Sequence, residues 1–423
     1  MLKCQLLSEG DHMGTRRFKF SDSKPATGAW ASKASDFADD VIKGPVVGQS
    51  EQSGKLTDIV NLFSERYEML RKILRHEWGF KETTNIYEVR KDKMVFKNRV
   101  INMIGIVASI RRTKSGGRMV EIEDKTGQMS VFISKENPAI DTLLPDDVIG
   151  VSGKFIKDGD LFIVDYVQFP EFLDTPRRMG AEYDPVSIAF ASDIHVGSKY
   201  FLQKEWDRMM EWFNSDHDLA KNIKYLVFAG DVVDGIGIYP GQEHNLTETD
   251  VYLQYEEFAR QLDRLPDHIT AVILPGNHDA VRPAEPQPVL ETLVQKKFSH
   301  AIHVGNPSRI NLSGIEVLAY HGKGIDDMVP RMAHVTYENP AEAMKEMLRK
   351  RHLAPMWGER NALSPEETDQ MIVSSTFQGQ SDFMRMLGYK PKMGYLSVYN
   401  IQSGESQVVC FADQANPSAG YKP

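Results

Sequence analysis

The sequence predicts a small all-β barrel followed by a larger α/β domain built on a parallel sheet. Residues 97–172 contain short alternating apolar runs separated by turn residues, which is typical of antiparallel strands. From Val186 onward, apolar runs alternate with amphipathic helices. Three of these runs end abruptly in Asp, His or Asn side chains. In open α/β sheets such side chains gather at the carboxyl ends of the strands, where ligands bind.

Bulk composition sets limits on the protein class. A chain of 423 residues has room for two or three domains, and 41% hydrophobic and 26% charged residues are ordinary for a globular protein. The net charge of −9 argues against a broad basic surface that grips nucleic acid, without excluding a local groove or a partner subunit. The two cysteines give no disulfide framework, and no run is apolar enough for a membrane span. These features favour an intracellular, cytoplasmic protein without membrane contact.

The chain before the barrel falls into two parts. Residues 1–55 are rich in Ser, Gly, Lys and Asp with little periodicity, so we predict disorder or a linker. Residues 56–95 form a docking helix region, because apolar residues recur at helical spacing from Ile59 to Leu74. We expect this helix to pack within the chain rather than on a partner.

Residues 96–175 are predicted to form the barrel. Strands are expected at 100–110, 118–123, 128–133, 147–155 and 160–167, with a short helix near 140–144. Five strands with one helix between the third and fourth is the pattern of an OB-fold. OB-folds often bind single-stranded nucleic acid through aromatic side chains and basic grooves. Since aromatic residues are few here, docking on a neighbouring domain and direct nucleic-acid contact both remain open.

Residues 183–400 are predicted to form the α/β domain, and 401–423 a tail. Strands are expected at 186–191, 225–229, 271–274 and 315–320, and helices at 203–213, 252–262 and 340–351. The polar side chains that follow these strands are Asp193 and His195, then Asp231 and Asp234, then Asn277, His278 and Asp279, and finally His321. Each group alone fits a surface loop or a helix cap. Together, carboxylate, imidazole and amide oxygen at one sheet edge suit a pair of divalent metal ions.

The order D-x-H, G-D-x-x-D, G-N-H-D and a lone His resembles the calcineurin-like metallophosphoesterase family. The resemblance implies an αββα-type sandwich and a two-metal site. It assigns Asp193 and His195 to one metal, Asp231 to both, and Asn277 and His321 to the second. It gives His278 a catalytic role beside the scissile phosphate, makes Asp234 and Asp279 orienting residues, and leaves Arg282 as a phosphate contact or a salt bridge. We expect Mn²⁺, with Zn²⁺, Fe²⁺ or Mg²⁺ as alternatives.

Longer strings resemble the small subunits of archaeal D-family DNA polymerases. They are Asp234 to Glu243, Pro275 to Pro288, Arg351 to Pro355 and Gln380 to Phe383. This resemblance implies a proofreading 3′–5′ exonuclease that acts on single-stranded or mismatched 3′ ends of DNA. It also implies a large polymerising subunit as the partner, and therefore a location with the nucleoid.

The chain departs from the family pattern at its final metal motif. The family carries G-H-x-H there, whereas the last histidine of this chain is His352. Loss of one imidazole from each metal leaves several hypotheses: a weakly active nuclease, a catalytically impaired subunit that stabilises the large subunit, or replacement by His334 or His244. A general nucleotide or protein phosphatase of the same fold is a further alternative.

Overall fold

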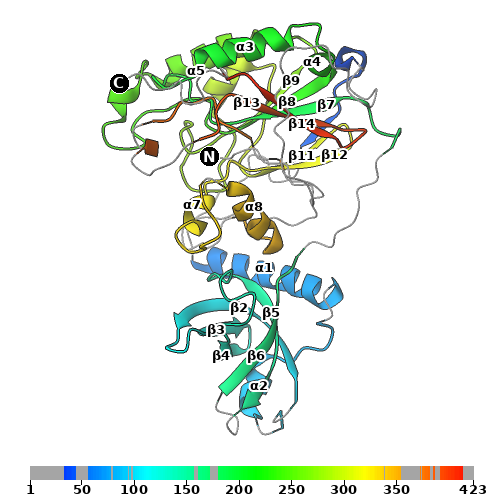
Figure 1. Cartoon of the computed structure of the whole chain (residues 1–423), viewed down its shortest axis with the longest axis vertical. Coiled ribbons are helices and arrows are strands. Elements are labelled where there is room, and N and C mark those ends of the chain that lie inside the picture. Colours follow the sequence, from blue (N-terminus) through cyan, green and yellow to red (C-terminus); the bar gives the residue numbers. More distant parts are fainter. Residues whose placement is uncertain are drawn as a thin grey trace.

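The structure is a computed structural model. It describes residues 33–43, 56–77, 80–93, 95–96, 99–156, 161–171, 180–337, 339–353, 372, 374–381, 384–385 and 391–412. The barrel lies at one end of the molecule and the α/β domain at the other, with helices α1 (Leu56–Glu77) and α8 (Pro340–Arg349) between them (Figure 1).

Five strands close into a barrel in the order β2-β3-β4-β6-β5. They are β2 (Ile101–Arg112), β3 (Arg118–Asp124), β4 (Gly127–Ile133), β5 (Val148–Ile156) and β6 (Leu161–Gln168). Alternate residues fill the interior, and this closed five-stranded barrel is compatible with an OB-like fold. The helix predicted near 140–144 is wrong, since this segment forms successive turns. The Asn137 side chain accepts the Ala139 N–H at 3.0 Å, a local bond that favours a turn.

Two helices cover the barrel. In α1, Tyr67, Leu70 and Leu74 pack against β2 and β5, and the Tyr67 hydroxyl donates to the Ile104 carbonyl at 3.1 Å. The short α2 (Ile86–Lys91) begins at Asn85, whose side chain caps the Glu88 N–H. The helix α1 therefore docks on its own chain.

The α/β domain contains two sheets. The larger has the order β10-β9-β8-β7-β13-β14, and the smaller the order β1-β11-β12. The strands of the larger sheet are β7 (Ser187–Ala191), β8 (Ile223–Ala229), β9 (Thr270–Leu274), β10 (Ile302–His303), β13 (Tyr395–Asn400) and β14 (Ser406–Cys410). Those of the smaller are β1 (Val41–Lys43), β11 (Ser308–Leu312) and β12 (Ile315–Ala319). Strands β7, β8, β9 and β10 run parallel, as the sequence predicts.

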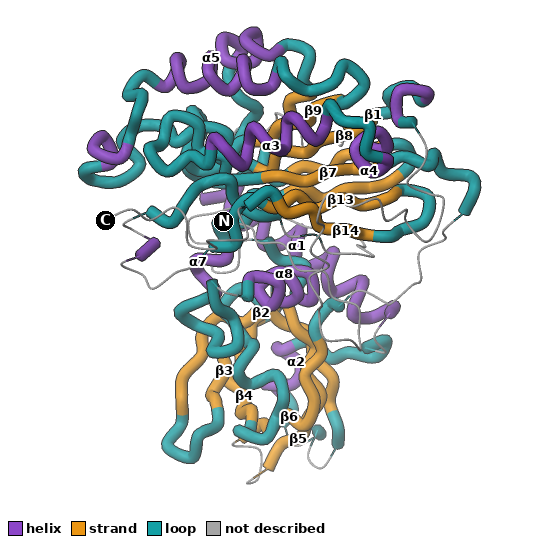
Figure 2. Tube along the Cα trace, turned by 45° about the horizontal axis from the view of Figure 1, so that its top comes forward, coloured by secondary structure: helices purple, strands orange, loops and turns teal. Residues whose placement is uncertain are grey.

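Helices complete the α/β domain. They are α3 (Gln203–Phe213), α4 (Asp218–Asn222), α5 (Val251–Leu262), α6 (Thr292–Gln295) and α7 (Ile325–Met328), with 3₁₀ turns at Ala34–Asp36, Gln242–Asn245 and Lys296–Phe298. Helices α3 and α5 lie over one face of the larger sheet (Figure 2), where aromatic and aliphatic side chains form the main core. A second core joins the opposite face to the smaller sheet.

Part of the predicted linker is ordered. Strand β1 pairs antiparallel with β11, and Ala34 is fully buried against the larger sheet. The Asp40 N–H donates to the Tyr225 hydroxyl at 3.0 Å, and Lys224 pairs with Asp39 at 3.0 Å. These partners lie far away in sequence, so local composition gives no sign of them. The remainder of the predicted linker lies outside the described residues.

The predicted tail is ordered at its start. Residues 401–412 include β14, which pairs with β13 at the edge of the larger sheet. No helix within the described ranges has both the length and the apolar character needed to cross a bilayer.

A buried ion pair joins the barrel to the α/β domain. Lys350, at the end of α8, lies 2.6 Å from Asp147 of the barrel, and both side chains are almost fully buried. Burial opposes charge on both groups, raising the pKa of Asp147 and lowering that of Lys350, so each charge depends on its partner. Arg351 adds a bond to the Pro170 carbonyl at 2.7 Å. The two domains are therefore fixed through α8.

Replacing Lys350 with Met should leave the buried Asp147 without its ion-pair partner. We expect a loss of about 3–5 kcal/mol in the free energy of unfolding, measured by urea denaturation. The matched control is Lys345→Met, because Lys345 pairs with Glu342 on the exposed side of the same helix and should cost less than about 1 kcal/mol. Adding Asp147→Leu to Lys350→Met should restore part of the loss. Equal stability of the two lysine variants would contradict this role.

Candidate metal centre

The predicted site residues meet at one edge of the larger sheet. Strands β7, β8 and β9 lie side by side and parallel, so the segments that follow them emerge together. The Asp193 N–H donates to the Gly230 carbonyl at 3.0 Å, and the His278 N–H donates to Asp231 Oδ1 at 2.8 Å. His321 follows β12 of the smaller sheet and reaches the same place.

The backbone is strained where it delivers these side chains. Asp193, His195 and Asp231 have φ of 50°, 56° and 53°, in the left-handed region that non-glycine residues seldom adopt. Gly276 permits close approach, because a Cβ there would lie 2.2 Å from Asp231 Oδ1. Strain of this kind persists where surrounding structure enforces it, commonly at functional sites.

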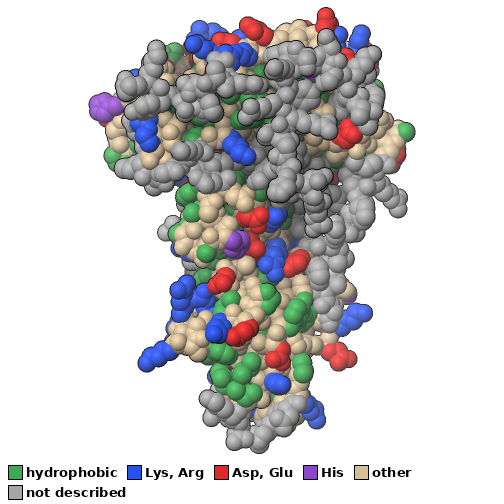
Figure 3. Space-filling model, viewed as in Figure 1, with side chains coloured by type: hydrophobic (Ala, Val, Ile, Leu, Met, Phe, Trp, Pro, Cys, Tyr) green, Lys and Arg blue, Asp and Glu red, His purple; other side chains and the backbone are tan. Residues whose placement is uncertain are grey.

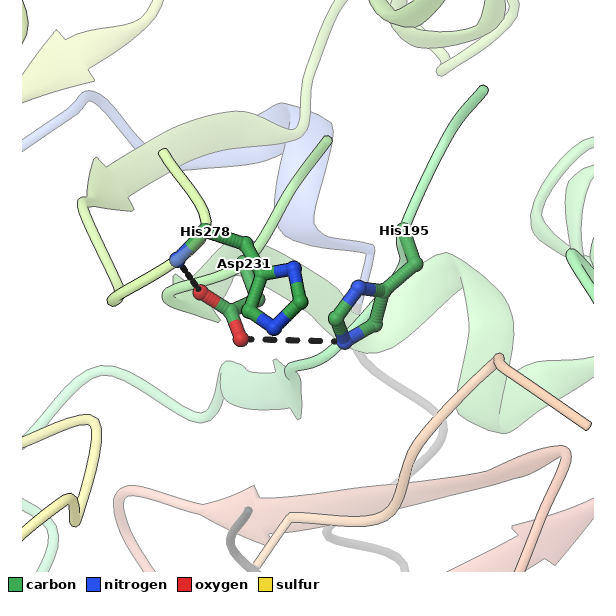
Figure 4. Close-up of side chains that lie close together, drawn as sticks. All are labelled: His195, Asp231 and His278. Atoms are coloured by element: carbon green, nitrogen blue, oxygen red, sulfur yellow. Dashed lines mark hydrogen bonds and ion pairs between the residues drawn. The ribbon is translucent and has the colours of Figure 1, made fainter. Parts of the chain in front are cut away.

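Asp231 lies at the centre of the cluster. Its Oδ2 is 3.6 Å from His195 Nε2 and 3.3 Å from His321 Nε2. Asp193 Oδ1 is 3.7 Å from His195 Nε2. Figure 4 shows His195, Asp231 and His278 pointing toward one another. Candidate ligand atoms thus form two groups that share Asp231: one with His195 and His278, the other with Asp193 and His321.

Three imidazoles are oriented in the same way. In each of them Nδ1 lies close to an oxygen. The Nδ1 of His195 lies 2.8 Å from Asp234 Oδ1, and the Nδ1 of His278 lies 2.7 Å from the Asp234 carbonyl oxygen. The Nδ1 of His321 lies 2.8 Å from the Ala229 carbonyl oxygen. Each of these oxygens is an acceptor, so each Nδ1 carries the hydrogen. The lone pair of a neutral ring is then on Nε2, as in a histidine prepared to bind a metal.

The donor set fits divalent metal ions. His321 Nε2 lies 3.2 Å from Asn277 Oδ1 and 3.3 Å from Asp231 Oδ2, so three acceptor atoms face one another. Acceptors at such distances repel unless a proton or a cation lies between them. Imidazole nitrogen with carboxylate and amide oxygen suits Mn²⁺, Fe²⁺ or Zn²⁺. The geometry brings together all five residues predicted as ligands and adds His278 to the cluster.

The predicted orienting residues hold this arrangement. Asp279 Oδ2 accepts the N–H groups of Asp231 and Gly276, both at 2.8 Å. Its Oδ1 accepts the hydroxyl of Tyr255 at 3.0 Å. Burial and the neighbouring Asp231 raise the pKa of Asp279 to about 6. Asp234 supports both His195 and His278.

The carboxylates and imidazoles stabilise one another's charges. Burial alone would raise the pKa of Asp231, yet the nearby His321 and His278 hold it well below its usual range. Burial alone would lower the pKa of His195, yet Asp193 and Asp234 raise it to about 10. At neutral pH the metal-free His195 therefore keeps a proton on both ring nitrogens.

Metal binding should release protons. A metal bound through Nε2 of His195 displaces a proton whose pKa is about 10, so we expect the apparent Mn²⁺ affinity to rise as pH increases from 6 to 8, by up to about tenfold per unit. Calorimetric titration in two buffers of different protonation enthalpy measures the released protons. Affinity independent of pH would contradict this expectation.

Three residues considered from the sequence lie apart from the cluster. Arg282 is exposed, and its guanidinium donates to the Pro286 carbonyl at 2.6 Å. Exposed His244 lies 3.8 Å from Glu243, and His334 lies 3.7 Å from Glu346. Within the described chain, neither histidine joins the candidate ligands.

A segment that is not among the predicted site residues returns beside Asp193. Thr376 forms a parallel bridge with Ser192, and its hydroxyl donates to the Asp193 carbonyl at 2.9 Å. The Gln378 side chain lies 3.4 Å from Asp234 Oδ1. The sequence signal nearest to it is the string Gln380 to Phe383, which resembles the D-family small subunits. Residues 354–371, immediately before the segment, lie outside the described ranges.

Comparisons with known proteins define the class first. A family model for the B subunits of DNA polymerases alpha and epsilon matches residues 188–376, which contain every candidate ligand. The DNA polymerase II small subunit of Methanocaldococcus jannaschii is 34% identical over 90% of this chain and 70% of its own. The small subunit of Archaeoglobus fulgidus is also 34% identical, over 87% of this chain and 80% of its own. The small subunit of Methanothermobacter thermautotrophicus is 34% identical over 86% of this chain and 82% of its own. The chain belongs to the family of archaeal DNA polymerase II small subunits, that is, of the D-family polymerase.

One of the matching solved structures shares only a short stretch with this chain. The asparaginyl-tRNA synthetase of Pyrococcus horikoshii covers 21% of this chain and 22% of its own, at 17% identity and a TM-score of 0.18. A likeness this small has no bearing on fold or function.

Proposed function

We propose that the chain is the 3′–5′ exonuclease subunit of a D-family DNA polymerase, which removes mispaired nucleotides with the help of two divalent metal ions. The observation that supports this most is the convergence of Asp193, His195, Asn277 and His321 on Asp231, within a family of DNA polymerase small subunits. The two sheets packed face to face, with α3 and α5 outside the larger one, are compatible with the calcineurin-like sandwich that the resemblance implies. The large polymerising subunit is the proposed partner.

The proposed chemistry is hydrolysis of the terminal phosphodiester. Divalent ions in such a site activate water and neutralise charge on the phosphate. Asp193, His195, Asp231, Asn277 and His321 would hold them. The protein fixes these groups before substrate arrives, because each imidazole is anchored through Nδ1. Rigid placement of charged groups is the main source of rate enhancement in phosphoryl transfer.

His278 is proposed to assist the departing oxygen. Its Nδ1 donates to the Asp234 carbonyl at 2.7 Å and lies 3.5 Å from Asp234 Oδ1. With Nδ1 held in this way, Nε2 is the ring nitrogen that is left to act on a substrate. A positioned imidazolium can donate a proton to the 3′ oxygen that leaves.

A catalytically impaired structural subunit is the second candidate. The observation that favours it is the absence of G-H-x-H, because no histidine follows His352 in the sequence. Each of the two groups holds three side chains, and one of the three in the first group is His278, the proposed proton donor. Metal affinity should then be lower than in a site with the extra imidazoles, and activity should require added metal.

The test uses the full chain with a DNA oligonucleotide carrying a mismatched, labelled 3′ end. We expect release of single nucleotides from that end with added Mn²⁺, and none with a chelator. An oligonucleotide blocked at its 3′ end is the control for end specificity. Failure to bind Mn²⁺ and to release nucleotides, with or without the large subunit, would leave the structural role. Faster hydrolysis of a small phosphomonoester than of DNA would favour a phosphatase.

A further inference from the structure

The barrel carries a basic hairpin far from the metal centre in sequence. We define the basic hairpin as residues 111–118, where β2 turns into β3. It contains Arg111, Arg112, Lys114 and Arg118, and Lys135 lies beside its turn, near Gly116. Lysine and arginine side chains gather on the side of the barrel where β2 and β3 meet (Figure 3). This concentration contrasts with a chain whose net charge is −9.

The cations of the basic hairpin are poorly neutralised. Arg118 lies 3.3 Å from Asp141, and Lys135 lies 3.9 Å from Glu136. Among the described residues, Arg111, Arg112 and Lys114 have no acidic partner. Arg112 also lies directly opposite Arg118 in the β2–β3 pair. Like charges opposite each other destabilise a hairpin, and Asp141 offsets only the charge of Arg118, so the Arg112 charge is left for an external anion to offset.

A half-buried aromatic ring, that of Phe132, shares a face of the sheet with Arg111, whereas Arg112 and Arg118 form the neighbouring row on the opposite face. The register places Arg111 opposite Met119, Met119 opposite Phe132, and Phe132 opposite Ile163. Directly paired residues share a face of the sheet, and none of these four is fully buried, so the row lies on the outside of the barrel. The Phe132 ring packs on the hairpin, because a Cβ on Gly117 would lie 2.6 Å from its Cζ.

We propose that the basic hairpin and Phe132 form a binding surface for single-stranded DNA. Arg111 and Lys114 would contact phosphates beside Phe132, Arg112 would contact the backbone where the strand passes the end of the hairpin, and Phe132 would stack against a base. Cations that follow the backbone beside an aromatic platform are the features by which single strands are held without sequence preference. An acidic protein segment would use the cations but would have no need of the ring. The proposal rests on DNA being the substrate, and it assigns the barrel the task of holding the strand.

The test measures binding to a fluorescent oligothymidylate of about 16 nucleotides, by anisotropy of the full chain with a chelator present. Chelation prevents hydrolysis, so binding is measured separately from nuclease activity. A variant in which Arg111, Arg112 and Lys114 are all replaced with glutamine should show a smaller salt dependence. The magnitude of the slope of log affinity against log salt should fall by about 2, since each single-strand phosphate contact contributes about 0.7. The corresponding loss of affinity is on the order of a hundredfold at about 0.1 M salt.

A second variant, Phe132→Ala, should weaken binding on the order of tenfold through lost stacking, with the salt slope unchanged. The matched control replaces three exposed cations of the α/β domain, Lys204, Arg260 and Lys296, with glutamine, and should bind like the wild type. Equal loss in the control and hairpin variants would overturn the proposal. So would a Phe132→Ala variant with wild-type affinity, because an acidic peptide would then fit the cations equally well. Hairpin-dependent binding without any nuclease activity would support this surface while refuting the nuclease.

Discussion

Replacing Asp231 with Asn should abolish metal binding and nuclease activity while leaving the fold intact. Asp231 is the one carboxylate shared by both groups of candidate ligands. Loss of a supporting residue alone costs roughly ten- to a hundredfold in metal affinity, so loss of the shared ligand should cost more than about a hundredfold. Nucleotide release should fall on the order of a thousandfold or more, because metal ions supply several kcal/mol of transition-state stabilisation.

The substitution suits the backbone of this position. Asp231 has a φ of 53°, and Asn is among the residues that tolerate that region best. The thermal midpoint of the metal-free variant should therefore stay close to that of the wild type. Asp216→Asn is the matched control, since Asp216 is exposed and pairs with Lys221. Metal stoichiometry by plasma emission spectroscopy and nucleotide release are the two measurements. A variant that still binds two ions tightly would show that Asp231 is not the shared ligand.

Replacing His278 with Ala should separate catalysis from metal binding. If His278 donates a proton to the leaving oxygen, the rate should fall by about 10²–10⁴-fold. The bound metal should stay at the wild-type level, because Asp193, His195, Asp231, Asn277 and His321 all remain.

His300→Ala provides the control, because His300 is an exposed histidine away from the sheet edge. It should retain both the rate and the metal content of the wild type. Loss of one equivalent of metal in His278→Ala would contradict the proton-donor role. It would instead identify His278 as a ligand that takes the place of a missing imidazole, which its distance from His195 and Asp231 permits.

Much of the site could be read from the sequence because its residues follow apolar strands. Asp193, Asp231 and Asn277 each come directly after a buried strand, and parallel strands bring their ends together. The anchoring of the imidazoles could not be predicted in detail. The acceptors for His278 and His321 are the backbone carbonyls of residues 234 and 229. Because every residue has a backbone carbonyl, the sequence cannot indicate which ones serve as acceptors.

The fold was predicted well where the contacts are local. The five barrel strands and helices α3 and α5 follow from alternation and helical spacing within each segment. The errors concern long-range or short segments. Strand β1 has three residues and pairs with β11 some 270 positions later, and β14 lies where composition suggested a tail. The turns at 137–144 replaced a helix because side-chain bonds such as that of Asn137 compete with helical ones.

Strand β1 has a practical consequence for shortened forms of the protein. Removing residues 1–55 would remove β1 and expose the edge of β11. The unpaired peptide groups of that edge could then pair with a strand of another molecule. Loss of Ala34, which is fully buried, would also leave a gap against the larger sheet. A cut ahead of Lys33 preserves both, so we expect proteins shortened there to stay monodisperse and those shortened to residue 55 to self-associate.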